Sequence, residues 1–167
     1  MSASMMVRVE PLVWPPPAGG DSRQVSGMLH GLAVELAAIR DALALAERLR
    51  DELASGEVGL LAQRLGAIDS VAVPVGHDST HLVSMLGAWS PQAGVHLRVA
   101  GEHRREILAA VRGWTWLAGQ GLLKEARLGS GLGRVVDSLT AAGEAVVAAD
   151  EALLACVRVP GDGQRCE

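Results

Sequence analysis

The sequence has almost no aromatic side chains. It contains no phenylalanine and no tyrosine, and its four tryptophans bring the aromatic content to only 2% of 167 residues. The apolar residues, 49% of the chain, are therefore mostly alanine, leucine and valine. Small aliphatic side chains favour closely approaching helices over thick sheets packed by bulky residues. We expect one mostly α-helical domain, because a chain of this length can bury a core without disulfides or metals.

The chain also lacks an excess of positive charge. Its net charge is −4, and its only adjacent basic pair, Arg104 and Arg105, has Glu102 and Glu106 close beside it. Proteins that bind a phosphate backbone gather basic side chains on one surface. The composition therefore argues against a nucleic-acid partner.

Long apolar runs and cysteine motifs are missing as well. The N-terminal MSASMMVRVEPLVWPPP has no signal-peptide core, and no window reaches the ~18 uninterrupted apolar residues of a membrane helix. The two cysteines, Cys156 and Cys166, lie outside metal-ligand spacing, and a bridge between them would fasten only the tail. The cysteines alone favour a reducing compartment. Without a cleavable signal peptide, we expect a protein of the cytoplasm, one exported by another route, or one within an assembled particle.

The two ends of the chain differ from its middle. Residues 1–21 are expected to form an extended arm, because prolines 15–17 and glycines 19 and 20 interrupt regular structure after the strand-like VRVE at 7–10. Asp21 or Ser22 can then cap the first helix of a single helical domain over 22–158. The remainder, 159–167, is expected to be a flexible tail.

Helical periodicity begins early in this domain. One apolar stripe has spacings of three and four, leaves Glu35 outside it, and predicts a helix that drifts to Leu49 and Leu53 and breaks at Ser55 and Gly56. The stripe consists of Leu29, Leu32, Leu36, Ile39, Leu43 and Ala46. A second piece over 57–69 follows, with Leu61, Leu65 and Ile68 on one face.

The middle of the chain is less regular. Pro74 in VAVPVG excludes a central strand, and Asp78 or Ser79 can cap a short helix through Trp89. GVHLRVAG, beginning at residue 94, then alternates apolar and polar side chains, which is the pattern of a strand or of an extended lead-in. Residues 7–10 and 94–100 are thus the candidates for a minor β element, and helix returns from Glu102.

The clearest helix is the last one. Eight apolar positions follow strict three-four spacing, as in coiled-coil packing: Leu132, Val135, Leu139, Ala142, Val146, Ala149, Leu153 and Cys156. Alanines 141, 145 and 148 beside this seam allow a second backbone to come close. GSGLG at 129–133 predicts a flexible joint to the preceding helix. The fold we expect is an antiparallel helical bundle or hairpin with a long C-terminal helix.

Two of the four tryptophans stand close together, in VRGWTWLAGQG. Two residues on a helix correspond to a rotation of about 200°, so Trp114 and Trp116 point to nearly opposite sides. Trp114 continues the stripe of Ile107 and Val111 and is expected in the core. Trp116 is then covered by the helix over 27–54, or it is an anchor for a pocket in a partner protein.

Residues that could carry chemistry are few. GHDSTH places His77 and His81 one helical turn apart, which suits a shared metal but lacks a third ligand and the glutamate of H-E-x-x-H. Glu102, in a first helical turn, is better explained by the helix dipole than by a metal site with His103 and Glu106. The glycines at 129, 131 and 133 follow a helix and lack the ending of a phosphate loop. We therefore expect neither an enzyme nor a bound cofactor.

Two segments taken together resemble a known family. VHLRVAGEHRREILAAVRGW at 95–114, followed by GRVVDSLTAAGEAVVAADEALLACV at 133–157, is similar to actinobacterial type VII secretion substrates of the Trp-X-Gly kind. The resemblance implies a helical hairpin with tryptophan and glycine near its hinge, a second hairpin as partner, and export through an ATP-driven membrane channel. The sequence departs from the family where Trp116 stands three residues before Gly119, and where Val146 or Val147 replaces the tyrosine of the export signal.

The leading hypothesis is a non-enzymatic helical interaction protein that forms oligomers with itself or with a second helical protein. Its expected partner-binding residues are Trp114, Trp116, Leu132, Val135, Leu139, Val146 and Leu153. A structural subunit of a larger particle, such as a virion or a tail adaptor, is a second hypothesis, since the arm and the tail would order on assembly. A small metal-dependent enzyme centred on His77 and His81 is a third.

Overall fold

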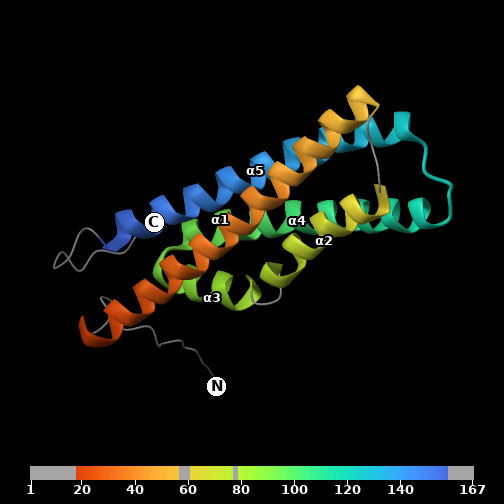
Figure 1. The fold of residues 1–167 in the computed structure, drawn as a ribbon. Helices are drawn as coiled ribbons and strands as arrows, with labels where there is room; N and C mark the ends of the chain where they lie inside the picture. Colours follow the sequence, from red (N-terminus) through yellow and green to blue (C-terminus); the bar gives the residue numbers. More distant parts are fainter. Residues whose placement is uncertain (1–17, 57–60, 77–78, 158–167) are drawn as a thin grey trace, which may run out of the picture.

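The described part of the chain consists of helices and short turns. The computed structural model describes residues 18–56, 61–76 and 79–157, and these residues contain five α-helices and no strand (Figure 1). The mostly α-helical fold expected from the composition is thereby confirmed. The helices are α1 (Ala18–Ser55), α2 (Leu61–Gly76), α3 (Ser79–Trp89), α4 (Pro91–Gly119) and α5 (Glu125–Val157).

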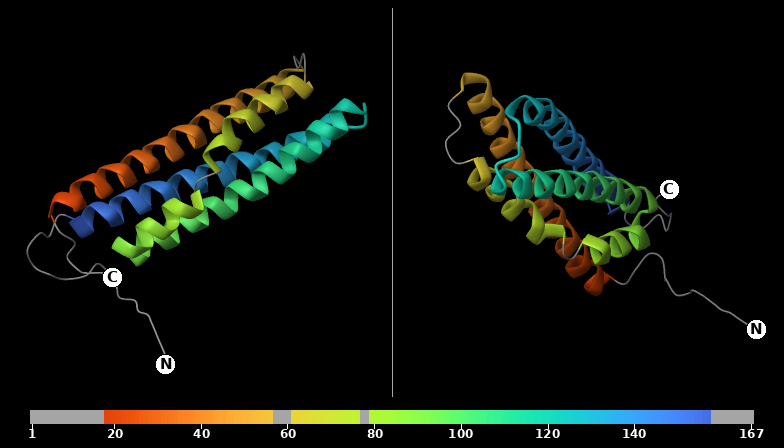
Figure 2. Two further views of the ribbon diagram at one scale, coloured as in Figure 1. Left: turned by 90° about the horizontal axis from the view of Figure 1, so that it is seen from below. Right: turned by 90° about the vertical axis from the view of Figure 1, so that its right-hand side faces the viewer.

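The five helices form an antiparallel four-helix bundle in which α2 and α3 together occupy one corner. The main contacts of α1 are with α5 and α2, whereas α4 packs on α5, α2 and α3. The chain runs up α1, back along α2 and α3, up α4 and back along α5 (Figures 1 and 2). α1 and α4 therefore lie at opposite corners, and the long helices α1, α4 and α5 set the length of the bundle.

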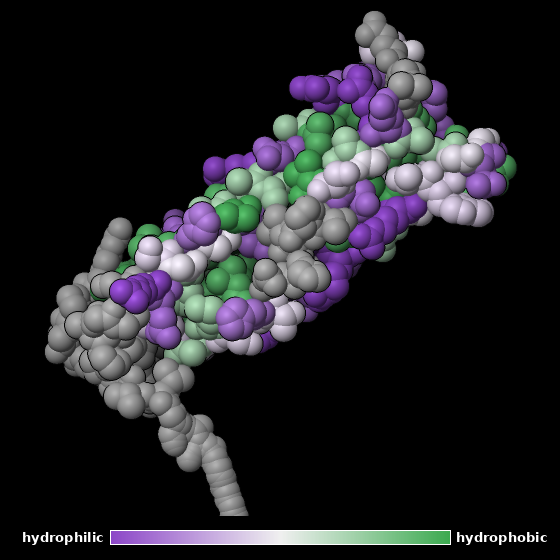
Figure 3. Space-filling model, turned by 60° about the horizontal axis from the view of Figure 1, so that its bottom comes forward, coloured by the Kyte–Doolittle hydropathy of each residue, from purple (hydrophilic) through white to green (hydrophobic). Residues whose placement is uncertain are grey.

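The core is built from three-four seams on the long helices. All eight positions predicted for the last helix are buried along α5, at 7% exposure or less. The seam of α4 has the same spacing and includes Ala93, Leu97, Ala100, Ile107 and Val111. Such seams interlock as in coiled coils, which suits a bundle of small side chains. On the face shown in Figure 3, hydrophobic and hydrophilic residues are interspersed along the bundle.

The seam of α1 is displaced from the predicted stripe. The buried seam consists of Met28, Leu32, Glu35, Ile39, Ala42, Ala46 and Leu49, with Ala38 buried beside it, while Leu29, Leu36 and Leu43 are only half-buried. The prediction that Glu35 lies off the core-facing stripe is wrong, because Glu35 is only 2% exposed. The predicted stripe and the buried seam have the same periodicity. The buried seam was not recognised in the sequence because it contains a charged residue, Glu35.

Glu35 is buried together with a partner of opposite charge. Nη1 of Arg104 on α4, itself 4% exposed, donates a hydrogen bond to Oε2 of Glu35. Burial raises the pKa of Glu35 above its ordinary value of 4.5, and the neighbouring Arg104 guanidinium offsets part of this rise. Arg104 occupies the seam position between Ala100 and Ile107. The pair thus joins the helices at opposite corners of the bundle.

The strand expected over 94–100 is wrong, because these residues lie in α4. Ser90, which is buried, caps this helix by accepting a hydrogen bond from the N–H of Ala93 at 3.2 Å, and Pro91 occupies its first turn. Val95 is exposed, whereas Leu97 lies in the core. The alternating pattern was therefore a chance overlay on the helical seam. The other strand candidate, 7–10, lies outside the described residues.

The predicted positions of two glycine interruptions are also wrong. Gly19 and Gly20 lie within α1, which begins at Ala18, so Asp21 and Ser22 are not its caps. GSGLG lies within α5, and the turn between α4 and α5 consists of residues 120–124 instead. By contrast, the break after Ser55 and the short helix ending at Trp89 are confirmed.

The contribution of the Glu35–Arg104 ion pair to stability can be tested by substitution. We expect Glu35→Met and Arg104→Met each to lower the free energy of unfolding by about 3–5 kcal/mol, because each leaves one buried charge without its partner. The double variant should lose less than either single variant, since it removes both charges. Urea unfolding at neutral pH measures all three values. Additive losses in the double variant would show that the two charges are not coupled.

Candidate protein-binding site

The tip of the α4–α5 hairpin is shaped by a glycine turn. Gly121 has a φ of 71°, a conformation that glycine adopts without strain. Its N–H donates to the carbonyl of Ala118 at 3.1 Å, and the N–H of Leu122 donates to the carbonyl of Leu117 at 2.9 Å. These two bonds are those of a Schellman motif, which ends α4 and turns the chain toward α5.

Two large apolar side chains are exposed at this tip. Trp116, in the last turns of α4, is 63% exposed, and Leu122, next to Gly121, is 61% exposed. They are the most exposed of the large apolar side chains in the part of the chain that the structure describes. The interpretation in which the helix over 27–54 covers Trp116 is therefore wrong. We call residues 116–123 the hairpin tip.

Trp114 points the other way, as the rotation between the two indoles requires. Its ring is half-buried and packs against the core from α4. A Cβ added at Gly131 of α5 would come within 2.9 Å of Cη2 of this ring, and closer still to Cζ2. Gly131 is therefore the residue that makes room for the indole. GSGLG was predicted to form a joint, but its Gly131 instead packs against the ring of Trp114. We call this contact the seat of Trp114.

Charged side chains flank the hairpin tip on both sides along the chain. Nε of Arg112 lies 3.1 Å from Oδ1 of Asp69, an ion pair that links α4 to α2. Lys124, Glu125 and Arg127 are exposed just beyond the tip, at the start of α5. An apolar centre with a charged rim is the usual composition of a protein-binding surface.

The remaining residues expected to bind a partner lie inside the bundle. Five of them are at most 4% exposed in the folded chain: Leu132, Val135, Leu139, Val146 and Leu153. They are part of the hydrophobic core to which α1 and α4 also contribute. In the folded chain these residues hold the hairpin together rather than offering a surface. Of the seven residues, Trp116 alone is classed as exposed.

The candidate metal ligands are not brought together in the described structure. His81 is exposed on α3, and His77 lies outside the described residues. Among the described residues no group of three His, Cys, Asp or Glu side chains could hold a metal ion. Cys156 takes part in a disulfide, which departs from the free thiols that the expected reducing compartment implies, and its Sγ lies 3.1 Å from the carbonyl oxygen of Trp89. Cys166 lies outside the described residues.

Leu122 and the Glu35–Arg104 pair were missed by sequence reasoning. A glycine at the end of a helix followed by an apolar residue is the signature of the Schellman motif, and it could have found Leu122. No comparable sequence pattern indicates the ion pair.

Among the described helices, none combines the length and the apolarity that a bilayer crossing requires. Comparisons with known protein families, curated proteins and solved structures give no match.

The packing of Trp114 against Gly131 can be tested by two matched glycine substitutions. We expect Gly131→Ala to lower the free energy of unfolding by about 1–3 kcal/mol, because the new methyl group collides with the indole. Gly133→Ala, in the same helix with open space around it, should raise the free energy by up to about 1 kcal/mol. Urea unfolding measures both values. A stabilised Gly131→Ala variant would contradict the packing described for Trp114.

Proposed function

We propose that this chain is a non-enzymatic helical interaction protein that binds a partner protein through its hairpin tip. The observation that carries the proposal is the exposure of two large apolar side chains, Trp116 and Leu122, within the tip of one helical hairpin. Large apolar side chains that stay exposed are costly to leave in water, and two of them in one short segment favour a surface that a partner covers. Tryptophan is also among the residues most enriched at the energetic centres of protein interfaces.

The rest of the structure supports a presenting role for the hairpin. The buried seam of α5 and the seat of Trp114 hold the two helices rigidly together. The Schellman motif fixes the backbone on which Leu122 sits. A preorganised surface loses little conformational entropy on binding, which favours affinity. The charged pair inside the bundle is closed off from solvent and has a structural role.

The hairpin also supports a more specific proposal, a substrate or partner of type VII secretion. Trp114 and Trp116 lie in the last turns of α4, and Gly119 and Gly121 lie at its end, next to the turn. A second hairpin, formed by α1 with α2 and α3, packs against the first (Figure 2). The resemblance implies such a pair of hairpins, here within one chain.

The hairpin tip can be tested by substitution. We expect Trp116→Ala to reduce recovery of a copurifying partner from the native host by about tenfold or more, because the anchor is lost. Helix content by far-UV circular dichroism should stay unchanged, since the side chain is mostly exposed. Val95→Ala is the matched control, because Val95 is also exposed on α4 but lies near its opposite end. Undiminished recovery with Trp116→Ala, or equal loss with Val95→Ala, would count against the tip.

The secretion proposal needs a test of its own. We expect the native host to release the protein into the medium when its type VII apparatus is intact, and to retain it when the ATPase of that apparatus is deleted. Immunoblots of medium and cells, with a cytoplasmic marker as lysis control, measure the distribution. Equal release from both strains would remove the secretion proposal and leave the hairpin tip untouched.

A further inference from the structure

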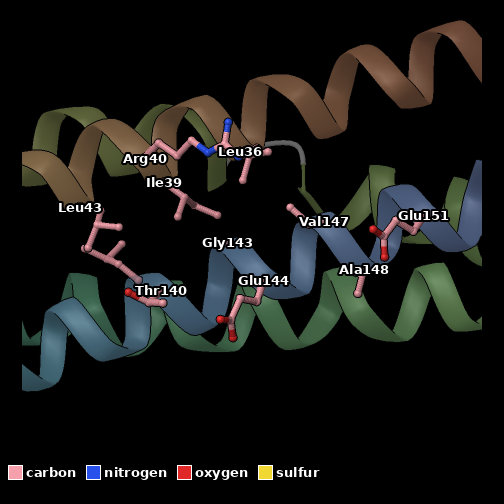
Figure 4. A pocket seen from close by; sticks show the side chains of 11 residues that line it. Leu36, Ile39, Arg40, Leu43, Thr140, Gly143, Glu144, Val147, Ala148 and Glu151 are labelled. Carbon is pink, nitrogen blue, oxygen red and sulfur yellow. The ribbon is translucent and has the colours of Figure 1, made fainter.

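A groove runs between α1 and α5 on the outside of the bundle. Its volume is about 330 Å³, and it is lined by Leu36, Ile39, Leu43 and Arg40 of α1 and by Gly143, Val147 and Glu144 of α5, among others (Figure 4). A Cβ added at Gly143 would lie 3.7 Å from Cγ2 of Ile39. Because Gly143 has no side chain, the groove is deeper at this position.

The groove exists because the apolar face of α1 is wider than the core needs. Its core seam includes Ile39, and the half-buried Leu36 and Leu43 lie beside that seam. On α5 the half-buried Val147 similarly lies on the groove side of the buried Val146. A helix that needed only to fill its own bundle would carry polar residues at these flanking positions. The additional apolar side chains of α1 and α5 lie side by side along the groove. They form a surface that helices of another chain can cover.

The two rims of the groove carry opposite charges. Arg40 stands on the α1 rim, and the carboxylates of Glu144 and Glu151 stand on the α5 rim (Figure 4). Among the ion pairs of the described residues, none joins Arg40 to either glutamate across the groove. These charges are therefore available to groups outside the chain.

We propose that this groove is the interface of a homodimer, and that its occupant is the same groove of a second copy. A two-fold axis along the groove, parallel to the helices, places α1 of one chain over α5 of the other. Each Arg40 then faces Glu144 of the second copy, and each interface contains this contact twice. The apolar stripes meet between these contacts. One groove carries both halves of the charge pattern, so it complements itself.

This inference does not depend on the partner proposed for the hairpin tip, and purified protein tests it. Light scattering coupled to size exclusion should give twice the chain mass of 17.4 kDa. We expect Arg40→Glu, and separately Glu144→Arg, to weaken the dimer by about tenfold or more, because each places like charges opposite one another. The double variant, Arg40→Glu with Glu144→Arg, exchanges the signs and should recover the dimer. Arg98→Glu, on the exposed face of α4, is the matched control and should leave the dimer unchanged.

Each other outcome overturns the groove interface. A monomeric wild type up to its solubility limit means that a second copy does not occupy the groove. A dimer insensitive to both charge reversals, or one that the exchanged double variant fails to recover, means that Arg40 and Glu144 do not meet. A dimer dissociated by Trp116→Ala means that the hairpin tip is the interface. Circular dichroism of every variant shows that a lost dimer is not a lost fold.

Discussion

The arrangement of the bundle depends on the buried contact between Glu35 and Arg104. These residues occupy two core positions on helices that otherwise lie at opposite corners, and each replaces an apolar side chain in a three-four seam. A buried ion pair adds little net stability, because desolvation offsets the attraction between the charges. The pair instead destabilises other registers of the two helices, because sliding α1 along α4 would leave two charges buried without partners. The pair therefore selects one register from several that apolar seams alone would tolerate.

The glycine contacts of α4 with α3 and with α5 require an equally fixed register between those helices. Gly94 of α4 crosses Gly87 of α3 so closely that an added Cβ would lie 2.9 Å from the Cα of Gly87. Gly131 similarly accepts the ring of Trp114. Such contacts work only where each glycine meets its one partner, because a slip by a single turn would bring a bulky side chain into the same space. With Trp114 held in this way, Trp116 must point outward from the end of α4.

The sequence predicts those parts of the fold that depend on spacing alone. The α5 seam and the opposed directions of Trp114 and Trp116 follow from helical periodicity, and the break after Ser55 follows from the glycine at position 56. Glu35, residues 94–100 and GSGLG were misjudged because what decides each lies on another helix. Glu35 is accommodated in this core because Arg104 lies opposite on α4, and a glycine can end a helix or make room for a side chain, depending on what packs against it. The groove depends likewise on two helices that are far apart in sequence.

The two proposed surfaces are compatible because they occupy different parts of the molecule. The groove lies on α1 and α5, whereas the hairpin tip lies at the end of α4. In a dimer whose axis runs along the bundle, both hairpin tips lie at the same end, so a single large partner can be bound by two tips. The second contact is then intramolecular, and the joint affinity can exceed that of one tip without any additional residue. This favours a modest apolar tip, because one exposed indole per chain is enough when two act together.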